Sequence, residues 1–150
     1  MHKMVIALAI AVVGMGPAIA SQETDVMAPV HQFVDGFNKS DVKMCQSGCA
    51  DQVFIIDDFP PHEWHGAGAI SNWLNDYDAY ARRNGITDGF VTLGKPRDID
   101  ITGVHAYVVV HTNFSLKKKG RLVKETGLMT LALHKDANGW RITAWAWADN

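Results

Sequence analysis

The sequence predicts an α+β domain in which three helices lie across one face of a curved, mainly antiparallel sheet. Two observations predict this class. Apolar residues recur at helical spacing through most of the first half of the chain, whereas from Gly89 onward apolar and polar residues alternate. Short turn signals then separate four long strand-like segments. The expected order is α-α-β-α-β-β-β-β, and helices gathered early with a sheet late are typical of α+β proteins.

The chain begins with a segment typical of secretory signal peptides, residues 1–20. Lys3 supplies a basic start, an apolar run follows over Met4–Val13, and small residues lead to Ala20. This layout predicts cleavage after Ala20, a secreted or periplasmic location, and a mature domain over residues 21–150. The apolar run is too short to span a bilayer, so we expect no membrane attachment after cleavage. The alternative is a buried N-terminal helix.

Composition argues against several classes of partner. The chain has 14 Lys and Arg against 16 Asp and Glu, and cleavage would remove only Lys3, leaving 13 against 16 and a net charge of −3. A mildly acidic domain lacks the basic surface that nucleic-acid binding requires. The basic run Lys117–Lys119 precedes a glycine and is typical of a hairpin tip. No Gly-rich strand–turn–helix fingerprint is present, so we expect no nucleotide or flavin cofactor.

Two helices are predicted before the first strand. The first carries an apolar stripe at three- and four-residue steps and ends near Asn38; the stripe comprises Val26, Val30, Phe33, Val34 and Phe37. Asp41 is a suitable N-cap for a second, short helix. Val42, Cys45 and Cys49 would lie on one side of that helix.

The two cysteines leave two interpretations open. Cys45 and Cys49 are four residues apart, which on a helix places both side chains on one face. An oxidising compartment would permit a disulfide, although this spacing requires some distortion. The alternative is a pair of buried thiols. Two cysteines supply only half of a tetrahedral shell, so a metal site is disfavoured.

A strand and a third helix follow. Gln52–Asp57 is rich in β-branched and aromatic residues and predicts a strand, which the Phe59-Pro60 step interrupts. The third helix begins at about Ala67, and its apolar stripe is Ile70, Trp73, Leu74, Tyr77 and Ala81. Two arginines in its last turn and Gly85 just beyond favour a helix C-terminus.

Four strands complete the predicted sheet, over Gly89–Ile101, His105–Leu116, Arg121–Lys135 and Trp140–Ala148. Turn residues at 102–103, 117–120 and 136–139 predict hairpins between them. The last strands are apolar on both sides. One side can serve the interior, so we expect the other to contact a second subunit in a homodimer.

These elements carry motifs that resemble a known superfamily. The order of elements, the stretches HQFVDGFNKSD and ADQVFIIDDFPPHEWHGAGAI, and the closing GWRITAWAWA are similar to the SnoaL-like branch of the nuclear transport factor 2-like superfamily. The resemblance spans roughly residues 26–148. It implies a cone-shaped sheet wrapped by helices, with a pocket between them. Ketosteroid isomerases, scytalone dehydratases and polyketide cyclases share this fold with pure binding proteins, so the fold alone leaves the reaction open.

The resemblance to the isomerases maps onto three positions. Laid without gaps from the FNKSD turn, the isomerase's general-base aspartate falls on Asp57 and its enolate-stabilising tyrosine falls on Phe33. Its partner acid falls in or near Met129–His134, which contains no carboxylate. The position of the isomerase's general base is thus kept, at Asp57, whereas the positions of both groups that stabilise its enolate oxygen carry other residues. Because removing one such donor commonly costs about a hundredfold in rate, we expect no steroid-isomerase chemistry by the usual route.

Alternation assigns different roles to the two adjacent acids. Asp57 is in phase with Val53 and Ile55, so it should face the interior, whereas Asp58 should face outward and fix the corner by accepting backbone N–H bonds. The alternative for Asp57 is that it too only fixes the corner. A carboxylate on an apolar wall should have a raised pKa, suited to proton abstraction.

The histidines are candidate proton donors. His65 and His111 are the candidates to act with Asp57; the alternative is that both are structural. His62 is interpreted as a solvated loop residue, and its spacing from His65 is too sparse for a metal motif.

The sequence therefore leads to two functional hypotheses. In the first, the exported domain holds a small, largely apolar molecule, and Asp57 is the polar anchor or base of lyase-, isomerase- or cyclase-type turnover. The candidate pocket-lining residues are Phe33, Phe37, Trp64, Trp73 and Trp145, although the tryptophans also suit core or dimer packing. In the second, the pocket is closed and the sheet face recruits a partner. No three candidate ligands share a metal-binding spacing.

Overall fold

The computed structural model describes residues 16–150. Its helices and strands are α1 (Gly16–Asn38), α2 (Val42–Ser47), β1 (Cys49–Ile56), β2 (Glu63–Gly66), α3 (Ala69–Asn84), β3 (Ile86–Thr102), β4 (His105–Lys118), β5 (Arg121–Asp136) and β6 (Gly139–Asp149). The predicted signal segment lies mostly outside the described residues, and only its end, from Gly16, falls in α1. Within the described residues, no helix is long and apolar enough to cross a membrane.

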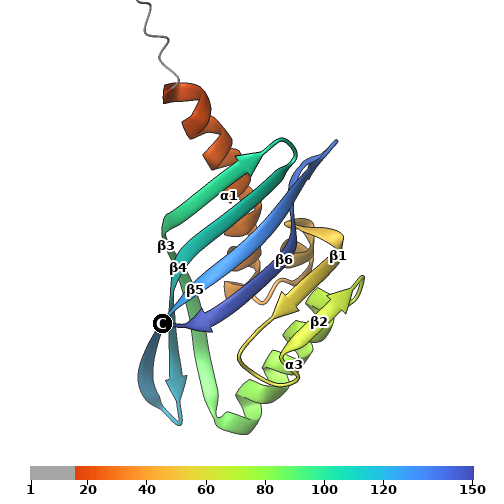
Figure 1. Ribbon diagram of the computed structural model, residues 1–150. Helices are drawn as coiled ribbons and strands as arrows, with labels where there is room; N and C mark the ends of the chain where they lie inside the picture. Colours follow the sequence, from red (N-terminus) through yellow and green to blue (C-terminus); the bar gives the residue numbers. More distant parts are fainter. Residues whose placement is uncertain (1–15) are drawn as a thin grey trace, which may run out of the picture.

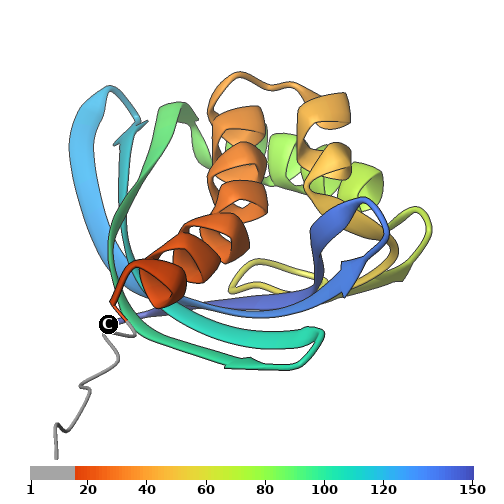
Figure 2. The same cartoon turned by 90° about the horizontal axis from the view of Figure 1, so that it is seen from above.

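The strands form one curved sheet in the order β2-β1-β6-β5-β4-β3. Neighbouring strands are antiparallel except β1 and β6, which are parallel. The sheet curves around α1, and α2 and α3 cover the remaining side (Figures 1 and 2). The α+β class and the helix-wrapped cone are confirmed, and the last four strands were predicted to within three residues at each end.

The structure adds one strand that the pattern did not predict. β2 spans only Glu63–Gly66, too few residues for a periodic signal. It is held at the sheet edge by pairing with β1, where Phe54 lies opposite His65 and Ile55 lies opposite Trp64. The segment between the two strands is therefore a hairpin that returns the chain toward α3.

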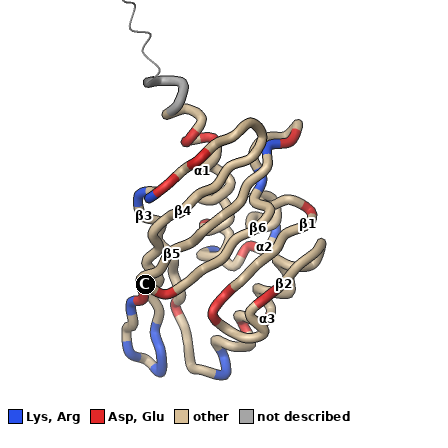
Figure 3. Tube along the Cα trace, in the orientation of Figure 1, with Lys and Arg blue, Asp and Glu red and all other residues tan. Residues whose placement is uncertain are grey.

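The helix signals were read correctly at most ends. The Asp41 side chain accepts a 3.0 Å hydrogen bond from Met44 N–H and caps α2, as expected. α3 ends at Gly85, which adopts φ 64°, a left-handed conformation that favours glycine. The basic run of the β4–β5 hairpin lies at its tip, also as expected (Figure 3).

The prediction that both cysteines lie on one face of a helix is wrong for Cys49, because α2 ends at Ser47 and Cys49 begins β1. Both cysteines are free and buried. Burial is the main reason that the pKa of each thiol is raised to about 12, so neither is reactive at neutral pH. The buried-thiol interpretation, and not the disulfide, describes this structure.

The core fills the space between the helices and the concave face of the sheet. Strand alternation decides which residues enter it: Val108 and Val110 are fully buried, whereas Tyr107, just before them, is 47% exposed on the outer face. Asn38, the last residue of α1, links this helix to β3. Its side chain accepts from Val91 N–H at 2.7 Å and donates to the Val91 carbonyl at 2.8 Å.

Candidate active site

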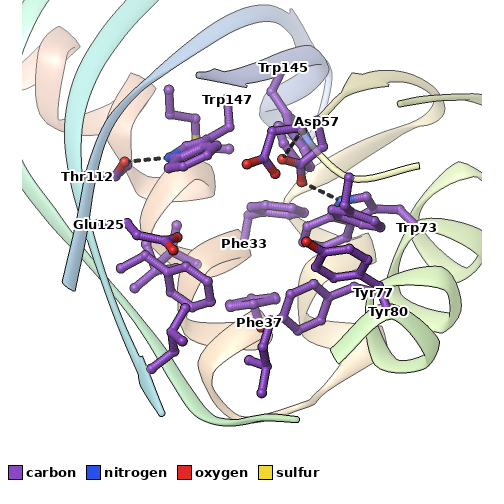
Figure 4. A pocket seen from close by; sticks show the side chains of 18 of the residues that line it. Phe33, Phe37, Asp57, Trp73, Tyr77, Tyr80, Thr112, Glu125, Trp145 and Trp147 are labelled. Carbon is purple, nitrogen blue, oxygen red and sulfur yellow. Dashed lines mark hydrogen bonds between the residues drawn. The ribbon is translucent and has the colours of Figure 1, made fainter. Parts of the chain in front are cut away.

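A cavity of about 130 Å³ lies between the helices and the concave face of the sheet. Nine of its nineteen lining residues are aromatic, so its walls are largely apolar (Figure 4). For comparison, an engineered cavity of about 150 Å³ lined by apolar side chains binds benzene. The cavity therefore has room for a body of about one ring.

The end of β1 places Asp57 on the wall of this cavity. Val53 and Ile55 face the core, and Asp57 continues their alternation just past the last residue of the strand. The following loop folds back, because Asp57 N–H donates to the carbonyl of His62 at 3.0 Å. His62 also approaches the Asp57 carbonyl through its ring Nδ1, at 3.1 Å. The loop thus holds the backbone of Asp57 in place.

Two donors hold the Asp57 carboxylate. Oδ2 accepts from Trp73 Nε1 at 2.8 Å, and Oδ1 accepts from the backbone N–H of Asp58 at 2.9 Å. Burial raises the pKa of Asp57 from 3.8 to about 6, although both hydrogen bonds lower it. The carboxyl group can therefore exchange a proton near neutral pH, which suits a general base.

Further acidic and phenolic side chains lie at the cavity. Asp58 and Glu125 both line it, and Glu125, from β5, lies across the cavity from Asp57 (Figure 4). Burial is the main cause that raises the pKa of each of these two carboxyl groups. Tyr77, from α3, also lines the cavity, and burial and nearby carboxylates raise its pKa to about 12. Its phenol therefore stays protonated and able to donate.

The far wall contains a polar pair that the sequence did not reveal. Thr112 is buried, and its hydroxyl accepts from Trp147 Nε1 at 2.8 Å (Figure 4). Gly127 allows the Trp147 ring to lie against β5, because a Cβ at this position would lie 2.6 Å from the ring. A glycine inside a long strand was the available signal for such a close approach.

Four of the five predicted pocket-lining residues line the cavity: Phe33, Phe37, Trp73 and Trp145. They form one aromatic cluster, in which Phe33 lies 5.5 Å from Trp145 and 5.7 Å from Trp73, centroid to centroid. Trp145 Nε1 is buried without a hydrogen-bond partner among the described residues. The edge-to-face contact of Trp145 with Trp73, at 5.0 Å and 85°, makes it an apolar wall.

Trp64 is the exception and does not line the cavity. It is buried beneath α3, where its Nε1 donates to Asp76 at 2.8 Å and its ring contacts Phe59 at 5.0 Å. Its role is to dock β2 against the helix. Sequence reasoning placed it in the pocket because it lies close to Asp57 in the chain.

The two predicted histidines also lie elsewhere. His65 is exposed and stacks on Phe54, with ring centroids 5.8 Å apart, while His111 is exposed on β4. Both belong to the outer phase of their strands, opposite to the cavity. The expected grouping of His65 and His111 with Asp57 is therefore corrected. The second polar groups come from α3 and β5, as Tyr77 and Glu125.

Asp58 has a dual position. Its backbone N–H donates to the Asp57 carboxylate, and its side chain lies at the cavity, so the prediction that Asp58 faces outward and fixes the corner is wrong. Among the described residues, no group of three His, Cys, Asp or Glu side chains is arranged to hold a metal ion. The titratable side chains that line the cavity are Asp57, Asp58, Tyr77, Tyr80, Lys118 and Glu125.

The fold and cavity define a class: α+β cones of the nuclear transport factor 2-like fold. No protein-family model matches the chain, and no curated protein matches it. Several solved structures, in contrast, match the chain in fold. A nuclear transport factor 2-like protein with a cystatin-like fold from Novosphingobium aromaticivorans is 12% identical, with a TM-score of 0.71; the match covers 91% of this chain and 92% of that one.

Two further structures have the same fold. A nuclear transport factor 2-like superfamily protein from Salmonella enterica is 15% identical, with a TM-score of 0.71 and coverage of 87% of this chain and 92% of that one. A ketosteroid isomerase-like protein from Erwinia carotovora is 14% identical, with a TM-score of 0.65 and coverage of 84% and 94%. The resemblance found in the sequence is thus confirmed at the level of the fold.

Proposed function

We propose that this protein is exported and binds a small, largely apolar molecule in the cavity, with Asp57 as its polar anchor and proton acceptor. The observation that carries the proposal is the Asp57 carboxylate on an aromatic wall, held by Trp73 and with a pKa near neutrality. Export rests on the signal-like pattern of residues 1–20.

The arrangement favours proton transfer on the bound molecule. Asp57 would remove a proton from carbon beside a carbonyl group, and the Tyr77 phenol, which also lines the cavity, would donate to the developing oxygen charge. This chemistry is common to isomerases, lyases and cyclases that pass through an enolate. The donor comes from α3, whereas the resemblance to the isomerases placed it on α1 at Phe33.

Two measurements test this proposal. Benzyl alcohol, a neutral single-ring probe, should quench tryptophan fluorescence saturably, because Trp73, Trp145 and Trp147 line the cavity. Cyclohex-3-enone in D₂O should then exchange its α-protons or isomerise, as followed by NMR. Asp57→Asn should keep the binding within about threefold and lower the exchange rate about a hundredfold or more.

The matched control is Asp98→Asn, which changes an exposed carboxylate on β3 away from the cavity. It should behave as wild type in both measurements. Saturable binding with no exchange in wild type would leave a binding protein without the proposed proton transfer. The absence of saturable binding would remove the proposal entirely.

A second function is favoured by the outer face of the sheet. Phe54, Ile56 and Tyr107 are 43%, 49% and 47% exposed on this face. Large apolar patches of this kind usually mark protein contacts. We propose that a second copy of the chain covers this face, which is compatible with an open cavity on the other side of the sheet.

A further inference from the structure

We propose that the ligand of the cavity carries a positive charge: an organic ammonium group on a body of about one ring. This inference rests on the proposed binding function and specifies the chemical class of its ligand. Two independent observations at the cavity support it, namely an excess of carboxylates and a dense aromatic lining.

The carboxylates outnumber the cations that accompany them. Asp57, Asp58 and Glu125 line the cavity, and Lys118 is the one basic residue that does so. Three negative groups against one positive group leave a formal excess of two negative charges. Within residues 16–150, the single ion pair joins Lys117 and Asp88, neither of which lines the cavity. The excess is therefore not neutralised by an ion pair.

The acidic groups come from separate elements and face a shared space. Asp57 follows β1, whereas Glu125 lies on β5 across the cavity (Figure 4). After burial, the negative charge of Asp149 is the next cause that raises the pKa of both Asp58 and Glu125. Asp58 further raises the pKa of Glu125, and Lys118 only partly opposes this. A cation between the two walls would relieve the repulsion on both sides.

The aromatic lining suits an organic cation better than a bare metal ion. The ring of Phe37 lies 5.5 Å from that of Trp73 and 5.2 Å from that of Tyr77, and Tyr77 lies 6.4 Å from Phe114. Aromatic faces attract ammonium groups, and cages of such rings recognise them. A metal ion instead needs several ligand atoms converging on one point, and the described residues form no such cluster.

The test compares three single-ring probes that differ in charge: benzylammonium, benzyl alcohol and benzoate. Binding to the full mature protein is measured at pH 8 by calorimetry and tryptophan fluorescence. At this pH the benzylammonium probe is charged and Asp57, whose pKa is about 6, is ionised. We expect benzylammonium to bind at least tenfold more tightly than benzyl alcohol, and benzoate to bind most weakly.

Two variants assign the preference to the cavity. Glu125→Gln should lower benzylammonium affinity about threefold or more while leaving benzyl alcohol affinity unchanged, because the amide keeps the shape and removes the charge. Asp98→Asn, on exposed β3, should leave both affinities unchanged.

The possible failures are distinguishable. Equal or tighter binding of benzyl alcohol, or a preference for benzoate, overturns the inference of a cationic ligand but leaves cavity binding intact. A cation preference that is undiminished in Glu125→Gln also overturns it, because the charge would act elsewhere. If none of the three probes binds saturably, the proposed binding function fails as well.

Discussion

The indole N–H of Trp73 donates a 2.8 Å hydrogen bond to Oδ2 of Asp57, joining α3 to the end of β1. This bond aims the carboxylate along the cavity wall without neutralising it. Trp73 is itself buried between Phe33 and Phe37, whose rings lie 5.7 and 5.5 Å away. The position of the base therefore depends on the same aromatic cluster that shapes the cavity.

The first prediction concerns stability against pH. The pKa of Asp57 is higher in the fold, at about 6, than its ordinary value of 3.8, so folding favours its protonated form. The resulting stabilisation is fully present below about pH 4 and is lost as pH rises through about 6. At about 1.4 kcal/mol for each pKa unit, the loss amounts to about 2–3 kcal/mol. Asp57→Asn should lack this loss, as measured by urea unfolding from pH 4 to pH 8.

Asp58 and Glu125 have pKa values shifted in the same direction, and Tyr77 and Lys118 also line the cavity. All four are shared by wild type and Asp57→Asn, so the difference between the two curves isolates Asp57. Parallel curves across this range would contradict the assignment.

The second prediction concerns Trp73, the hydrogen-bond donor to Asp57. Trp73→Phe removes the hydrogen bond that lowers the pKa of Asp57, so this pKa should rise above 6. Trp64→Phe is the matched control, because it removes an equivalent 2.8 Å bond from a buried indole to Asp76, away from the cavity. Carbon NMR titration of the Asp57 carboxyl group should show an upward shift in Trp73→Phe alone. An equal shift in both variants would mean that a general loss of packing, and not the loss of the Trp73 hydrogen bond, changes the pKa of Asp57.

Local patterns were sufficient for the fold and for the central residue of the site. Two-residue alternation along Val53, Ile55 and Asp57 depends only on strand geometry, so it correctly placed Asp57 inside. The same rule could not place His65 or His111, because β2 is too short for a periodic signal and β4 is apolar on both sides. Closeness to Asp57 in sequence was a poor guide to closeness in space.

The remaining site residues depend on tertiary arrangement. Glu125 and Thr112 reach the cavity because the sheet that contains β5 and β4 curves around α1 (Figure 2), and no local signal in either strand reports that curvature. Tyr77 was correctly placed on the apolar stripe of a helix, but the stripe does not distinguish core from cavity wall. The phase change from helix to strand before Cys49 was missed because α2 has only six residues.

The third prediction concerns the two hydrogen bonds that link Asn38 of α1 to Val91 of β3. Asn38→Ala removes both hydrogen bonds to the Val91 backbone and leaves those groups without their partners. We expect a loss of about 2–3 kcal/mol in the free energy of unfolding, measured by urea denaturation. Asn84→Ala removes only one local bond, to the Tyr80 carbonyl, and should cost less than about 1 kcal/mol. Similar losses in the two variants would show that the pair of hydrogen bonds between Asn38 and Val91 has no special role.

The fourth prediction concerns the homodimer. The proposed contact face carries Phe54 and Tyr107, so Tyr107→Asp should convert the dimer into a monomer, as measured by light scattering. Leu122→Asp is the control, because Leu122 is 66% exposed and pairs with Lys117 beside the β4–β5 turn, at the other end of this strand pair from Tyr107. It should leave the mass unchanged. A monomeric wild type at all concentrations, or a dimer that survives in Tyr107→Asp, would exclude this interface.

The fifth prediction concerns processing at the N-terminus. Residues 20–25 are exposed, and Val26 is the first buried side chain that the structure describes. Cleavage after Ala20 would therefore keep every side chain that the structure describes as buried, and would remove one exposed hydrogen bond, from the Thr24 hydroxyl to the Ala20 carbonyl. A chain beginning at Ser21 should unfold within about 0.5 kcal/mol of the full-length chain. Intact-mass measurement on protein from the periplasm or medium should find Ser21 as the first residue. Recovery of the chain only from the cytoplasm, with Lys3 retained, would contradict export.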